Sequence, residues 1–134
     1  MPSRPRALRI ALHGDTELSG VPAVAGEVVR LGFRHSIYGS AVEEEFVVEE
    51  AGLRLVRLRY GEARLAEFYG HEHARRDGDW WVVDAEPCLH SSITVRVSAD
   101  SAMRLSTPSM TVPLTECIRA GGAIRMSVVS ADHA

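Results

Sequence analysis

Hydrophobic positions along the chain come in short runs separated by turn residues, and in several runs they alternate with polar positions. In residues 27–34, for example, Val29, Leu31 and Phe33 occupy every second position, which places their side chains on one face of a strand. No segment of ten or more residues shows a helical period. The pattern predicts an all-β single domain, an antiparallel β-sandwich or partly open barrel of about 8–10 short strands with at most one or two short helical turns.

Three segments depart from a simple succession of strands. The alternation changes parity within residues 53–60, which predicts either a bulge near Leu55 or apolar cover on both faces. Residues 61–65 suit a short helical turn and residues 66–73 an extended segment, whereas residues 112–118 suit either a strand or a short helix. The predicted strands are residues 7–12, 27–34, 41–48, 53–60, 80–84, 93–97, 103–106 and 123–129.

The length of 134 residues suits one domain. We expect a folded β core over residues 7–129, with flexible tails at residues 1–6 and 130–134. No stretch approaches the roughly 20 apolar residues that span a bilayer, and the apolar run 7–12 is too short for a signal peptide. We therefore expect a soluble protein with no membrane-spanning segment. It is expected to be cytoplasmic as written, or periplasmic or at the cell envelope if an export segment has been removed.

Charge and cysteine content exclude several classes of function. The formal net charge is -3 and no basic stripe is present, which argues against a nucleic-acid partner. All 15 basic residues are arginine, so chemistry that needs a lysine, such as Schiff-base formation, is excluded. Cys88 and Cys117 are too far apart for a Cys-x-x-Cys zinc site. Two free thiols are expected, with one disulfide as the alternative.

The histidines are candidate metal ligands. His71 and His73 would lie on one face of an extended segment, a spacing that suits a metal ion if a third ligand, His90 or His35, approaches. A metal-assisted hydrolase that uses His71, His73 and His90 is therefore the alternative to a noncatalytic protein. The simpler interpretation is an exposed pair of histidines, and we expect no metal and no cofactor.

Nucleophilic catalysis has little support in the sequence. Ser36, Ser91 and Ser92 lie close to histidines along the chain, but neighbouring residues of a strand point to opposite faces and do not form a triad. The Gly-x-Ser-x-Gly motif is also absent. We therefore predict that the protein is not an enzyme and has no catalytic residue.

The acidic run 43–45 places one carboxylate in an apolar row. Glu44 shares its parity with Val42 and Phe46, whereas the glutamates on either side of it face the other way. A carboxylate in such a row must find a partner or shift its pKa. One interpretation is an edge strand whose inward charge blocks aggregation. The other is a pairing with His35 or an arginine.

The run 33–46 resembles the core motif of the domain of unknown function 1850 family, in which an aromatic strand leads into His-Ser-hydrophobic, a short turn and Val-x-Glu-x-Phe. Residues 112–128 are similar to the closing segment of that family, with its double glycine and final strand. The resemblance covers residues 8–129, although Phe33 stands where the family often has tyrosine. The matching residues are His35, Ser36, Ile37, Val42, Glu44 and Phe46, with Glu45 as the other register for the carboxylate.

The resemblance implies an accessory or binding role and no established activity. Members of the family are commonly encoded beside, or fused to, TRAP-type solute transporters, so a transporter component or a small solute is the expected partner. This hypothesis has two versions. The predicted binding residues form either a structural histidine–carboxylate contact that sets the register of the hairpin, or a site that binds a ligand. They are His35, Ser36, Tyr38, Glu44 and Glu45.

Overall fold

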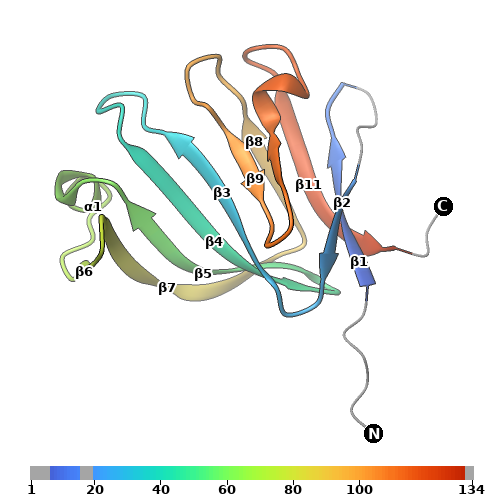
Figure 1. Cartoon of the computed structure of the whole chain (residues 1–134), viewed down its shortest axis with the longest axis horizontal. Coiled ribbons are helices and arrows are strands. Elements are labelled where there is room, and N and C mark those ends of the chain that lie inside the picture. The colour runs from blue at the N-terminus through green and yellow to red at the C-terminus, as the bar shows by residue number, and fades with distance from the viewer. Residues whose placement is uncertain (1–6, 16–19, 132–134) are drawn as a thin grey trace, which may run out of the picture.

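The computed structural model describes residues 7–15 and 20–131, which form two antiparallel β-sheets packed face to face (Figure 1). This confirms the predicted all-β, sandwich-like fold, and in the described part of the chain no barrel closes. The four-stranded sheet has the order β2 (Val21–Val24), β1 (Ala7–His13), β11 (Ala123–Ser130) and β8 (Ser92–Arg96). The seven-stranded sheet has the order β10 (Thr111–Pro113), β9 (Arg104–Ser106), β3 (Val28–Arg34), β4 (Ala41–Glu49), β5 (Gly52–Tyr60), β7 (Trp80–His90) and β6 (Arg75–Asp77). Two short helical segments accompany the sheets, α1 (Ala63–Phe68) and the 3-10 turn η1 (Leu114–Glu116).

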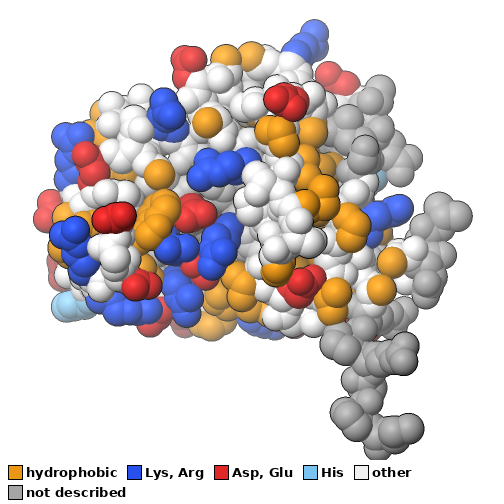
Figure 2. Space-filling view, in the orientation of Figure 1, with side chains coloured by type: hydrophobic (Ala, Val, Ile, Leu, Met, Phe, Trp, Pro, Cys, Tyr) orange, Lys and Arg blue, Asp and Glu red, His pale blue; other side chains and the backbone are white. Residues whose placement is uncertain are grey.

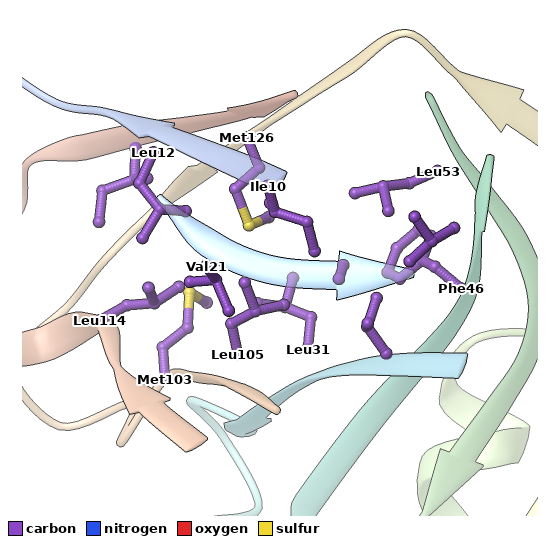
Figure 3. Packing of buried hydrophobic residues seen from close by; sticks show 14 of the residues in the cluster. Ile10, Leu12, Val21, Leu31, Phe46, Leu53, Met103, Leu105, Leu114 and Met126 are labelled. Atoms are coloured by element: carbon purple, nitrogen blue, oxygen red, sulfur yellow. The ribbon is translucent and has the colours of Figure 1, made fainter. Parts of the chain in front are cut away.

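The main core lies between the inner faces of the two sheets, where alternate residues of each strand meet (Figure 3). Ile10 and Met126 come from the smaller sheet, and Leu31 and Leu105 come from the larger one. Each of these side chains is at most 1% exposed. Burial of a side chain of this size contributes about 1.5–3 kcal/mol. The shared apolar layer is therefore what holds the two sheets together.

A bulge in β5 explains why the hydrophobic parity changes within that strand. Phe46 of β4 pairs with Leu55, but the preceding Glu45 pairs with Arg57, which leaves Val56 as an extra residue. The extra residue returns the later apolar side chains of β5 to the inner face. The predicted bulge near Leu55 is therefore confirmed, and the whole strand contributes to one apolar surface.

Several elements differ from their predicted extents. The strand predicted for residues 80–84 is only the first half of β7, which continues to His90. Residues 112–118 were predicted to be either a strand or a short helix, and both hold in part, because β10 ends at Pro113 and η1 follows directly. The extended segment predicted for residues 66–73 is wrong, since α1 ends at Phe68 and turns follow. A helix of six residues is too short to show a helical period.

Two strands, β2 and β6, were not predicted, and both lie at the edge of a sheet. The three residues of β6, Arg75–Asp77, are exposed and charged. Because an exposed edge strand needs no apolar face, no hydrophobic alternation marks it in the sequence.

The remaining expectations concern the chain ends, the thiols and the membrane. β11 reaches Ser130, within the expected C-terminal tail, and residues 1–6 and 132–134 lie outside the described residues. Cys88 and Cys117 are free thiols. Within residues 7–15 and 20–131, no helix is long and apolar enough to cross a bilayer.

Candidate functional site

The inner face of the larger sheet continues past the main core towards α1. Val42 and Tyr60 pair across β4 and β5, and Leu65 and Ala66 of α1 join them in a second hydrophobic cluster. All four residues are at most 2% exposed. Phe33 of β3 packs against both clusters. This end of the sheet is therefore an apolar surface that α1 covers in part.

A cavity of about 330 Å³, which we call the inner-face cavity, is lined by residues of both clusters. Glu44 and His71 are the titratable groups of its lining besides two tyrosines. Ligand pockets typically have such dimensions, with apolar walls and a few polar groups that orient the ligand. The apolar and aromatic lining residues are Phe33, Val42, Leu55, Leu58, Tyr60 and Tyr69.

Glu44 supplies the carboxyl group of the inner-face cavity, and the strand register explains its position. It lies opposite Leu31 of β3 and Leu58 of β5, so its side chain belongs to the inner apolar row, as its parity in the sequence indicated. Among the described residues, no hydrogen bond or ion pair joins Glu44 to another side chain. Burial raises the pKa of Glu44, and the charge of His90 acts in the opposite direction.

Aromatic rings form one wall of the inner-face cavity. The rings of Tyr60 and Tyr69 stack with their centroids 5.5 Å apart and 19° between their planes, and His71 lies 6.0 Å from Tyr60. Burial, followed by the influence of Tyr69 and Glu44, raises the pKa of Tyr60 to about 12. Burial also raises the pKa of Tyr69. Both phenols therefore keep their protons at neutral pH and remain uncharged hydrogen-bonding groups.

His35 stabilises the turn between β3 and β4. Its Nδ1 accepts hydrogen bonds from the backbone N–H groups of Ile37 and Tyr38, at 3.2 and 3.3 Å. Its ring, which belongs to a residue only 6% exposed, stacks on Tyr38 and meets Phe68 of α1 edge-on. Because Nδ1 accepts, neutral His35 carries its proton on Nε2. This histidine thus joins the turn to α1.

The five residues predicted to bind a ligand lie in three separate places. His35, Ser36 and Tyr38 are in the β3–β4 turn, Glu44 is in the inner-face cavity, and Glu45 lies on the opposite face of the sheet. Ser36 lines a broad, open depression beside the turn. The expected histidine–carboxylate contact is not formed among the described residues, because His35 lies beyond the paired ends of β3 and β4, whereas both glutamates pair in mid-strand.

On the outer face of the larger sheet, Glu45 is surrounded by arginines. It is 2% exposed and lies 3.4 Å from Arg30, 3.2 Å from Arg57 and 3.5 Å from Arg59. Arg57 also lies 3.6 Å from Asp84, so the charges alternate from β3 across β4 and β5 to β7. Figure 2 shows arginine and acidic side chains together over β3, β4 and β5. We call Arg30, Glu45, Arg57 and Asp84 the outer charge ladder.

The strand order and the outer charge ladder test the two interpretations of the acidic run 43–45. β4 lies between β3 and β5, so the interpretation as an edge strand is wrong. The pairing with His35 or an arginine that was expected of Glu44 is not formed among the described residues; arginines pair instead with Glu45, on the other face of the sheet. The members of the ladder neutralise one another, which gives this face a structural role.

The histidines considered as metal ligands do not converge. His71 and His73 follow α1 and lie outside any strand. The prediction of a metal site required both side chains to lie on one face of a strand, so its basis is missing. His90 ends β7, where it pairs with Leu53. Within the described ranges, no three His, Cys, Asp or Glu side chains are placed to hold a metal ion.

Sequence reasoning singled out Glu44 and His71 but missed the aromatic wall. Tyr60 reaches the inner face only because of the bulge in β5, and Tyr69 lies in the turn after α1. In the sequence, only the break in hydrophobic alternation within residues 53–60 indicated that the side chain of Tyr60 could lie on the inner face.

In comparison with known proteins, no family model, no curated protein and no solved structure matches the chain. The resemblance to the domain of unknown function 1850 family therefore stays a prediction.

The substitution Glu44→Gln should stabilise the protein by about 1 kcal/mol at pH 8 and leave it nearly unchanged at pH 4. A carboxyl group whose pKa is raised in the folded state destabilises that state only when it ionises. The penalty is therefore absent below the unfolded pKa and grows as the pH rises through the higher folded value. Thermal unfolding at both pH values measures the effect, with the exposed Glu86→Gln as control. A destabilised Glu44→Gln variant at pH 8 contradicts this expectation.

Proposed function

We propose that the chain is a noncatalytic binding domain that takes a small organic molecule in the inner-face cavity. The observation that carries this proposal is the unpaired carboxyl group of Glu44 in a cavity with apolar and aromatic walls. Glu44 is partly buried, and partial burial of a carboxyl group that no other side chain hydrogen-bonds costs free energy, so this arrangement does not serve the stability of the fold. A ligand that supplies the missing partner accounts for it.

The lining of the inner-face cavity favours binding over catalysis. In the described part of the chain, it contains no serine, threonine, cysteine or lysine that would serve as a nucleophile. Its two candidate acid–base groups, Glu44 and His71, form no hydrogen bond with each other in the described structure. Acid–base catalysis typically uses a group that a neighbour orients and tunes.

An accessory role beside a TRAP-type transporter, with a small solute as the ligand, is the biological setting that the family resemblance implies. A binding domain with a cavity of this size is compatible with that role. A transporter gene beside the gene for this chain would support this part of the proposal.

Binding of the neutral fluorescent probe N-phenyl-1-naphthylamine tests the proposal. The probe should bind the wild-type protein with increased fluorescence, and Leu58→Trp, which fills the inner-face cavity, should weaken binding at least about tenfold, or about 1.4 kcal/mol. Leu89→Trp is the matched control, because Leu89 is 38% exposed and does not line the cavity.

Thermal unfolding verifies that both tryptophan variants are folded, and Leu55→Trp serves as a second filling variant. The proposed function is overturned if the wild-type protein binds neither this probe nor the smaller compounds 2-phenylethylamine, 2-phenylethanol and 3-phenylpropionate. It is also overturned if folded filling variants bind the probe as well as Leu89→Trp does.

A further inference from the structure

We infer that the ligand of the inner-face cavity is an organic cation, an amine or quaternary ammonium ion attached to an apolar group. The inference rests on the proposed function and names the chemical class that this site recognises. Two independent features of the lining, its carboxyl group and its stacked rings, favour the same class of ligand.

The distribution of charge across the larger sheet favours a cation. Arg57 and Arg59 flank Leu58 in the sequence, but their side chains lie on the outer face with Glu45. Among residues 7–15 and 20–131, no arginine lines the inner-face cavity. The charge of His90 acts on Glu44, but His90 does not line the cavity. An ammonium group on an incoming ligand would therefore pair with Glu44 without a competing guanidinium group.

The aromatic wall favours the same class of ligand. A cation is attracted to the faces of aromatic rings, and the attraction strengthens when water is excluded. Tyr60 and Tyr69 stack beside Glu44, and Phe33 and His71 complete the aromatic part of the lining. A carboxylate among aromatic rings is complementary to an ammonium group, whereas an anion would meet repulsion from Glu44.

The size of the inner-face cavity limits the apolar part of the ligand. Its volume of about 330 Å³ is at the lower end of ligand cavities. The cavity is also lined by Leu55 and Leu58, which suit a hydrocarbon group. The geometry therefore favours a compact ligand, such as one ring with a short ammonium-bearing arm.

Three probes of similar size and different charge test this inference by calorimetric titration at pH 7.5. They are 2-phenylethylamine, which is a cation, 2-phenylethanol, which is neutral, and 3-phenylpropionate, which is an anion. The wild-type protein should bind the amine at least about tenfold more tightly than the alcohol, and the carboxylate most weakly. Glu44→Gln should weaken binding of the amine about tenfold and change binding of the alcohol less than about twofold. Glu86→Gln should bind all three as the wild-type protein does.

The outcomes separate this inference from the proposed function. If the alcohol binds as tightly as the amine, or if Glu44→Gln leaves the amine affinity unchanged, the cavity binds ligands but does not select cations, and the inference is overturned. The same conclusion follows if N-phenyl-1-naphthylamine binds and the amine does not. If neither that probe nor any of the three compounds binds, the proposed function is overturned as well.

Discussion

Replacing Gly52 by alanine should destabilise the protein by about 3 kcal/mol or more. Gly52 begins β5 with a φ of +150°, and the chain passes close to it where β7 leads into β8. A methyl group at this position would overlap the carbonyl oxygen of His90, lie 2.9 Å from its carbonyl carbon and lie 3.1 Å from the Cα of Ser91. These are backbone atoms, so no change of rotamer relieves the overlap and the strands must separate.

Denaturant unfolding measures the effect of Gly52→Ala, with Gly78→Ala as the matched control. Gly78 also has a positive φ, of +61°, but an added methyl group there has no heavy atom within 4 Å. The control should therefore show only the backbone cost of about 1 kcal/mol. Equal destabilisation of the two variants would contradict the close approach of the β7–β8 connection to β5.

The second large effect is expected at the outer charge ladder, where Glu45→Gln should cost about 2–3 kcal/mol. Glutamine keeps the size of the side chain but removes the charge that three arginines share. Loss of one partner from a fully buried ion pair costs more, but Arg30 and Arg57 are about two-fifths exposed, and water screens part of their charge. The remaining cost reflects arginines that lose their anion in a partly buried position.

Asp84→Asn is the control for Glu45→Gln, because Asp84 belongs to the same ladder but its side chain is 67% exposed. It should destabilise the protein much less than Glu45→Gln does, because solvent screens the pairs of an exposed carboxylate. Denaturant unfolding at low salt and in 1 M NaCl separates the two, since salt screens exposed pairs much more than buried ones. A Glu45→Gln variant as stable as the wild-type protein would show that desolvation of Glu45 outweighs its attraction to the arginines.

The parts of the fold that could be predicted are those in which a long strand has one buried face. β3 and β4 show this, because apolar inward residues recur at every second position of both strands, with Glu44 as the exception. The bulge in β5 was detectable for the same reason, as a break in an otherwise regular alternation. β6 was not predicted, since three exposed residues carry no periodic signal. α1 was predicted only in part, as a short helical turn at residues 61–65, because six residues are too few to show a helical period.

The candidate site was predicted in part, because its residues come from two kinds of segment. Glu44 lies in a regular strand, so its parity alone placed it among apolar neighbours. Tyr69 and His71 follow α1, and only the three-dimensional path of that turn brings them to Tyr60. His35 and Ser36 are neighbours of Glu44 in a sequence motif but not in space. Proximity along a hairpin is therefore a poor guide to a site unless the strand register is known.

The pairing of β1 with β11 has a practical consequence for attaching the protein to other molecules. The backbone N–H of Ala131 donates to the carbonyl of Ala7 at 3.4 Å, so the start of β1 and the end of β11 lie side by side. This end of the molecule is remote from α1 and from the turns that border the inner-face cavity (Figure 1). A fusion partner or a solid support joined at Ala7 or at Ala131 should therefore leave the cavity open to solution. An immobilised form of the domain would thus be suitable for measuring the proposed binding of organic cations.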